Sequence, residues 1–148
     1  MFFQLVLSHL NANEIEAAKE VIDDPDLVRR STIVKIWQAE WMLIKRMRQQ
    51  GEAMGAYERI NSFVGLEGLN LSLQMRMLWL GSKLSFESGL YGETKVWVDR
   101  LVPVLKEIGQ TELIEQVESD ARLTLAESLL RQDAVEEGLG ILASVRNE

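Results

Sequence analysis

Apolar residues recur at spacings of three and four along most of the chain, which is the pattern of amphipathic helices. Glycines mostly stand between these apolar stretches, where they favour turns. No segment alternates apolar and polar residues for long enough to indicate a β-strand. We therefore expect an all-α protein whose helices are joined by short turns.

The spacing predicts eight helices. Their approximate ranges are 1–10, 13–23, 31–50, 52–64, 73–87, 91–108, 112–131 and 133–146. Asn13 and Thr111 are the expected N-caps of two of them. Between the second and third helices, Asp24 either caps a helix that Pro25 opens or belongs to a turn that leaves the cap to Ser31.

Three more positions concern helix ends and bends. Gly109 is expected at the end of a helix, and Asn70 or Ser72 is expected to cap the helix that follows residue 68. Pro103 lies inside the predicted helix 91–108, where proline removes a backbone donor and clashes with the preceding turn. We expect a kink or a break at Val102.

Three segments of the chain superimpose in register. In each, an aliphatic residue and its neighbour are followed after seven or eight positions by a turn residue, and five positions later by a small residue. The matching residues are Leu43, Ile44, Gly51, Ala56 and Ile60; then Leu80, Gly81, Gly89, Thr94 and Val98; then Leu125, Ala126, Asp133, Gly138 and Leu142. A fainter copy near the start of the chain has Leu5, Ala12, Ala17 and Val21.

This pattern resembles the tetratricopeptide repeat, in which a Leu-Gly pair, a Gly or Asp turn and a small residue opening the second helix follow one another. The small positions from Ala17 to Gly138 lie 39, 38 and 44 residues apart, whereas that repeat has about 34 residues. The longer spacing is similar to the divergent repeats of about 40 residues in bacterial signal-transduction ATPases of the maltose-activator type, or to HEAT arrays. The stretch from Gly109 to Leu130 is similar to the linker and first helix of the former.

The resemblance implies a right-handed superhelix of about four antiparallel helix hairpins within one domain. The approximate hairpins are 1–24, 25–66, 67–109 and 110–148. It also implies that one face of the first helix of each hairpin lines a peptide groove. The candidate groove residues are Gln38, Trp41, Lys45, Arg48, Met75, Leu78, Ser82, Phe86, Leu123, Glu127 and Arg131, with Asp120 in the same register. The other interpretation is that these side chains only cover the neighbouring hairpin.

The aromatic residues and the histidine have simpler interpretations. Trp37 and Trp97 are expected in the core, because aromatics at helical spacing usually pack there. Trp41 differs because Lys45 follows on the same face, so an indole and a cation could together hold a partner. His9 is expected at a surface or an interface.

Composition narrows the classes of function. The 148 residues carry a net charge of −7 with a pI of about 4.9, which opposes direct binding of nucleic acid. The chain has no cysteine and one histidine, which excludes disulfides, thiolate zinc sites and most histidine metal cages. Phosphate-loop motifs are absent, and carboxylates such as Glu115 and Glu118 fit solvated helix faces. We expect no cofactor, no metal site and no enzyme activity.

The remaining expectations concern location and partners. No apolar run is long enough to span a membrane and no basic residue precedes the apolar opening, so we expect a cytoplasmic protein. The leading hypothesis is a module that binds a protein or peptide, within a larger signalling or transcription-regulatory protein. The alternative is a small-molecule effector-sensing domain of a transcriptional regulator. Apolar stretches at both ends of the array predict self-association or contact with neighbouring domains.

Overall fold

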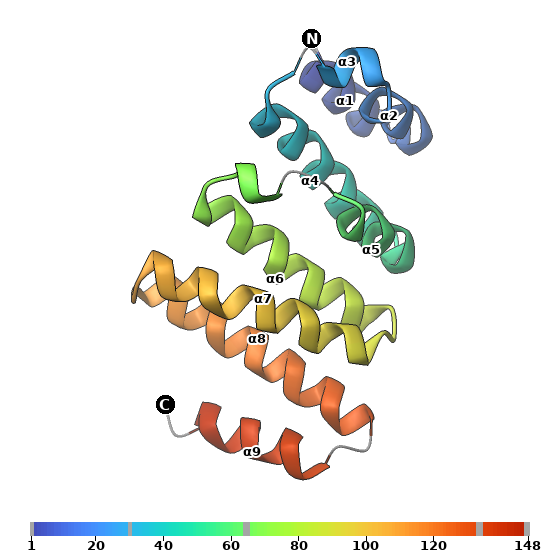
Figure 1. The fold of residues 1–148 in the computed structure, drawn as a ribbon. Helices are drawn as coiled ribbons and strands as arrows, with labels where there is room; N and C mark the ends of the chain where they lie inside the picture. Colours follow the sequence, from blue (N-terminus) through green and yellow to red (C-terminus); the bar gives the residue numbers. More distant parts are fainter. Residues whose placement is uncertain (1, 30, 64–65, 133–134, 147–148) are drawn as a thin grey trace. The chain divides into compact units, whose positions relative to one another are not determined.

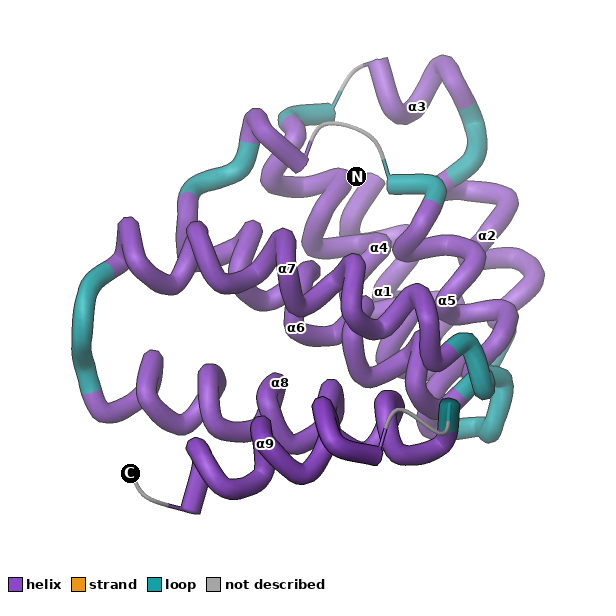
Figure 2. The backbone as a smooth tube through the Cα atoms, turned by 60° about the horizontal axis from the view of Figure 1, so that its bottom comes forward, coloured by secondary structure: helices purple, strands orange, loops and turns teal. Residues whose placement is uncertain are grey.

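The structure is a computed structural model that describes residues 2–29, 31–63, 66–132 and 135–146. Within these ranges every regular element is a helix and there is no strand, as Figure 2 shows. The prediction of an all-α protein is therefore confirmed. In the same ranges, no helix combines the length and apolar character that crossing a membrane requires.

The helices are labelled in Figure 1. Their bounds are α1 Phe2–Asn11, α2 Ile15–Ile22, α3 Pro25–Arg29, α4 Ile33–Gln49, α5 Ala53–Asn61, α6 Leu71–Glu87, α7 Tyr91–Ile108, α8 Glu112–Arg131 and α9 Val135–Arg146, with a 3-10 turn at Leu66–Gly68. The chain divides between Leu69 and Asn70 into two compact units, which we call the N-terminal and the C-terminal unit. The assignment of all four hairpins to one domain stays a prediction.

The N-terminal unit is built around α4, which contacts α1, α2 and α5. The apolar side of α4 carries Trp37, Leu43, Ile44 and Met47 at helical spacing, and all four are buried. Side chains that complete this core are Val6, Leu10, Ala18, Ile22, Ala56 and Ile60. The pattern of threes and fours in the sequence therefore corresponds to the buried faces of these helices.

A network of charges ties three helices of the N-terminal unit together. The Arg59 guanidinium donates to both oxygens of Glu40, at 3.0 and 2.6 Å, and to both oxygens of Asp23, at 3.2 and 2.9 Å. Burial raises the pKa of Glu40, although Arg59 opposes that shift. Burial acts to lower the pKa of Arg59, but the two carboxylates outweigh it and raise that pKa.

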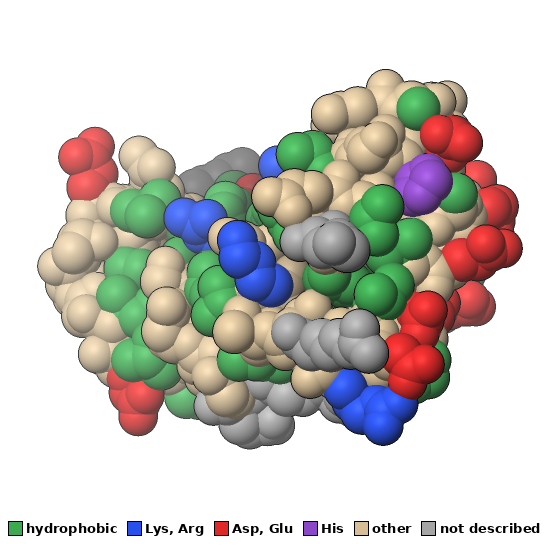
Figure 3. All heavy atoms as spheres, turned by 90° about the horizontal axis from the view of Figure 1, so that it is seen from above, with side chains coloured by type: hydrophobic (Ala, Val, Ile, Leu, Met, Phe, Trp, Pro, Cys, Tyr) green, Lys and Arg blue, Asp and Glu red, His purple; other side chains and the backbone are tan. Residues whose placement is uncertain are grey.

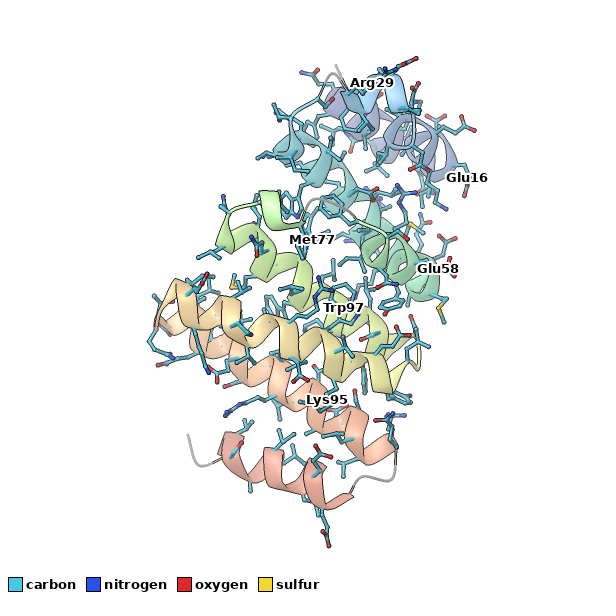
Figure 4. All side chains as sticks on the ribbon, viewed as in Figure 1. Glu16, Arg29, Glu58, Met77, Lys95 and Trp97 are labelled. Atoms are coloured by element: carbon cyan, nitrogen blue, oxygen red, sulfur yellow. The ribbon has the colours of Figure 1, made fainter. Side chains whose placement is uncertain are left out.

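The C-terminal unit stacks α6, α7, α8 and α9, and each consecutive pair is in contact. Small side chains allow these helices to approach: Gly81 lies against Trp97, and Gly138 lies near the backbone of Ala126. Ser85 and Thr94 are buried and share a hydrogen bond of 3.0 Å between α6 and α7. Figure 4 shows Trp97 in the layer between α6 and α7.

Several predicted helix ends are confirmed. The side chains of Asn70 and Thr111 accept hydrogen bonds from backbone N–H groups three residues later, so both are N-caps. Gly51, Gly89 and Gly109 have φ of 80°, 76° and 100° just after helices, where L side chains are strained. The expected turn residue Asp133 lies outside the described residues.

One local prediction is wrong. Asn13 does not cap α2: it adopts a φ of 60°, and its side chain accepts a hydrogen bond from Gln50. Of the two alternatives for Asp24, the first is confirmed: Pro25 opens the short helix α3, and the Asp24 side chain accepts a hydrogen bond of 2.9 Å from the backbone N–H of Asp26. The cap of α4 is Thr32 and not Ser31. α7 continues through Pro103, so the helix does not break at Val102, and the kink expected there stays a prediction.

Candidate functional site

The expected groove residues of α4 lie on one face of that helix. Lys45 is exposed, with its Nζ 5.8 Å from the centre of the half-buried Trp41 ring. The Trp41 ring stacks on Trp37, with centroids 5.4 Å apart and planes 22° apart. Gln38 is half-buried, and its Oε1 has no hydrogen-bond partner among the residues that the structure describes; Arg48 is exposed. Trp41 thus rests on its own helix while Lys45 extends into solvent.

On α6 the predicted register holds at Phe86, which is half-buried, and fails at the other three positions. Met75, Leu78 and Ser82 are 4%, 2% and 0% exposed, so in this structure they offer no surface to a partner. The side chains that reach the surface stand one position later along the helix, at Trp79 and Lys83. A shift of one residue turns a side chain by about 100° around a helix axis, which is enough to exchange the buried face for the exposed one.

The expected residues of α8 do reach the surface. Leu123 is 40% exposed, and Glu127 and Arg131 are exposed as well. Asp120 is partly exposed one turn before Leu123. The spacing of these four residues is that of a single helical face.

Trp79, Lys83 and Asp120 connect the exposed faces of α6 and α8. The Trp79 indole Nε1 donates a hydrogen bond of 2.6 Å to Asp120 Oδ2, and Lys83 Nζ lies 3.0 Å from the same oxygen. Lys83 Nζ also lies 5.2 Å from the centre of the Trp79 ring. Each of the three side chains therefore holds the other two in place.

A second connection lies near the C-terminal ends of the same two helices. The Arg131 guanidinium lies 5.5 Å from the centre of the Phe86 ring and 5.7 Å from that of Tyr91. The two rings are themselves 5.5 Å apart. Among the described residues, no carboxylate lies within 4.0 Å of Arg131, so stacking fixes this cation and leaves its N–H groups available to an acceptor.

We call this surface the α6–α8 face. Its residues are Trp79, Lys83, Phe86, Asp120, Leu123, Glu127 and Arg131. Trp79 of α6 contacts Asp120 of α8, and the later residue Phe86 of α6 contacts the later residue Arg131 of α8. The two helices therefore run parallel. Leu123 is thus an exposed apolar side chain on a face where Asp120 is held by Trp79 and Lys83, and Arg131 by Phe86.

Sequence reasoning missed Trp79 and Lys83. The fourfold spacing of Trp79 and Lys83 places an indole and a cation on one helical face, which is a signal that the sequence contains. Their common partner Asp120 lies 41 residues beyond Trp79, and no local pattern indicates that contact.

The remaining expectations concern the two core tryptophans, the histidine and possible metal ligands. Trp37 and Trp97, each 5% exposed, lie in the core, which confirms that prediction. His9 is partly exposed at the surface, with its Nδ1 3.5 Å from Glu14. No group of three or more potential metal ligands occurs among the residues that the structure describes.

In comparisons with known proteins, the chain matches no protein-family model, no curated protein and no solved structure.

Proposed function

We propose that this chain is a non-enzymatic, cytoplasmic interaction module that binds a peptide or protein segment on the α6–α8 face. Its hairpins are tetratricopeptide-like repeats that stack as a right-handed superhelix, and the spacing of the repeats is similar to that of the maltose-activator type. In this proposal the chain is part of a larger signalling or transcription-regulatory protein.

The repeat interpretation is supported by where the structure puts the small residues of the repeat. Ala56, Gly81, Thr94, Ala126 and Gly138 are all buried. Each lies in a helix that is paired with its neighbour along the chain, α4 with α5, α6 with α7 and α8 with α9. Buried small residues at equivalent places of successive pairs are what a stacked helical array requires.

The observation that carries the binding proposal is the preorganised α6–α8 face. Leu123, 40% exposed, offers an apolar contact on the same face of α8 as Asp120 and Arg131, which are held by Trp79 and Phe86 of α6. Interfaces are dominated by a few such anchors, with aromatic residues and Arg enriched among them. Fixed side chains also lose less conformational entropy when a partner binds.

Trp41 and Lys45 are a second candidate contact, in the N-terminal unit. We propose that a partner's apolar residue packs on the exposed part of the indole while its carboxylate meets Lys45. Truncation by Trp41→Ala should then weaken binding by about 2 kcal/mol. Reversal by Lys45→Glu together with Arg48→Glu should mainly slow association and reduce its dependence on salt.

Self-association is a further part of the proposal. Leu5 on α1 and Leu139 on α9 are 38% and 54% exposed. Apolar side chains of this size on the surface can be covered by another copy or by a neighbouring domain. Sedimentation of Leu5→Glu and Leu139→Glu at high concentration tests this, because each variant should shift the chain towards the monomer.

The binding proposal can be tested without a known partner. Peptides would be selected from a displayed random library on the parent chain, and their dissociation constants would be measured by titration. We expect Leu123→Asp to weaken the selected peptides at least tenfold, or about 1.4 kcal/mol. The matched control is Val96→Asp on α7, because Val96 is also an exposed aliphatic residue, at 57%.

Two results would contradict the proposal. Either the library enriches no peptide, or Val96→Asp weakens binding while Leu123→Asp, shown to be folded by circular dichroism, does not. Enrichment of a small molecule in a parallel screen, with no peptide, would favour the effector-sensing alternative instead.

A further inference from the structure

A cavity of about 330 Å³ lies in the N-terminal unit, apart from every residue used above for binding. It is bounded by α1, α3 and the start of α4. Its lining residues are Phe2, Phe3, Gln4, Leu27, Ser31, Thr32 and Lys35. Figure 3 looks from above onto the side of the N-terminal unit where α1 and α3 lie, and shows apolar side chains gathered there with Lys or Arg side chains next to them.

One wall of the cavity is apolar and already in place. Phe2 is 6% exposed, so its ring is held by the core of the unit. Phe3 and Leu27 are half-buried and complete the wall. The cavity volume falls at the lower end of the range of about 300–1,000 Å³ that small-molecule sites occupy.

The polar side of the cavity presents donors. Lys35 Nζ lies 5.2 Å from the centre of the Phe3 ring, and among the described residues it has no carboxylate within 4.0 Å. The Thr32 hydroxyl accepts from the backbone N–H of Lys35, which leaves its own proton free to donate. The Gln4 amide adds further donors, and no Asp or Glu is among the described residues that line the cavity.

This combination selects a class of ligand. An apolar wall next to an ammonium group without a counter-ion suits a molecule with an apolar body and one negative charge. A ligand cation would meet Lys35 with like charge, and a neutral apolar ligand would leave the donors unused. We propose that the cavity binds a small amphipathic carboxylate, with its apolar body against Phe2, Phe3 and Leu27 and its carboxylate at Lys35 Nζ.

The proposal is tested on the whole chain with 4-phenylbutyrate as the probe and 4-phenylbutanol as its uncharged counterpart. Backbone amide NMR is recorded during titration. We expect saturable shifts for the amides of residues 2–4 and 31–35 with the carboxylate, and binding at least tenfold weaker with the alcohol.

The variant pair Lys35→Gln and Lys106→Gln gives a matched control. Both lysines are exposed on helices, Lys35 on α4 beside the cavity and Lys106 on α7 in the C-terminal unit. Lys35→Gln should weaken phenylbutyrate at least tenfold, whereas Lys106→Gln should leave its affinity unchanged.

The proposal is overturned if phenylbutyrate produces no saturable shift up to its solubility limit, or if the alcohol binds as well. It is also overturned if Lys35→Gln, folded by circular dichroism, binds like the parent. None of these results bears on the α6–α8 face, so the two proposals fail separately.

Discussion

The indole of Trp97 occupies the space that Gly81 leaves open between α6 and α7. A Cβ atom added at Gly81 would lie 2.6 Å from Trp97 Cδ2 and Cζ3, far inside van der Waals contact. A rigid, buried ring cannot give way as the end of a flexible side chain can. The absence of one methyl group on α6 therefore sets how closely α7 approaches it.

Gly81→Ala should destabilise the chain by about 1–3 kcal/mol, because the helices must separate or the indole must leave its rotamer. Urea unfolding followed by helicity measures the change. The control is Gly140→Ala on α9, where an added Cβ would meet nothing within 4 Å. That variant should be neutral or more stable by about 0.5–1 kcal/mol, since alanine favours helix. Equal stability of the two variants would contradict the packing argument.

Arg59→Leu should cost about 3 kcal/mol, because it leaves the Glu40 carboxylate, 12% exposed, without its cation. The control is Glu16→Gln, which breaks a pair with Lys19 in which Glu16 is 85% exposed, and it should cost less than about 0.5 kcal/mol. Figure 4 shows Glu16 on the solvent side of the N-terminal unit. Thermal unfolding of both variants would show whether the charge network stabilises the unit.

The raised pKa of Glu40 also predicts that the stability of the folded chain depends on pH. Its pKa in the folded chain is raised above 4.5, so the folded state binds this proton more tightly than the unfolded state does. The contribution of Glu40 to stability is therefore full below pH 4.5 and decreases as pH rises through the raised pKa. We expect the parent to gain stability relative to Glu40→Gln when pH falls from neutral towards 4.5. A difference that stays constant with pH, or changes in the other direction, would refute this.

The contact between Trp79 and Asp120 should appear as a coupling energy. A double-mutant cycle with Trp79→Phe and Asp120→Asn should give about 0.5–3 kcal/mol, since the variants remove a hydrogen bond of 2.6 Å to a charged acceptor. The same cycle with Trp41→Phe in place of Trp79→Phe should be additive within about 0.5 kcal/mol, because Trp41 belongs to the other unit. Additivity in both cycles would mean that the two helix faces are not joined as described.

Local signals predicted most helix ends well. Asn70 and Thr111 cap their helices with their own side chains, and Gly109 ends α7, since each of these conformations depends on the next few residues alone. Asn13 was misassigned because its side chain meets Gln50, which is 37 residues away in the sequence. No pattern around Asn13 contains that information.

The residues of the candidate site were predicted on α8 but mostly missed on α6. On α8, the register implied by the resemblance to the tetratricopeptide repeat selected Leu123, Glu127 and Arg131, and all three are exposed. On α6, apolar residues stand on nearly every side, including Met75 and Leu78, so periodicity does not distinguish its faces.

The sequence by itself therefore determined the helical class, most of the turns and the repeated small residues, because these follow from spacing, capping and backbone conformation within a few residues. The tertiary structure alone decided which side of α6 is exposed, and brought Trp79 to Asp120 and Arg131 to Phe86. Those outcomes depend on how the helices pack against one another, and this packing is built from contacts such as that of Gly81 with Trp97, which sets how closely α6 and α7 approach. Such a contact joins residues from different helices, and no pattern within either helix specifies it.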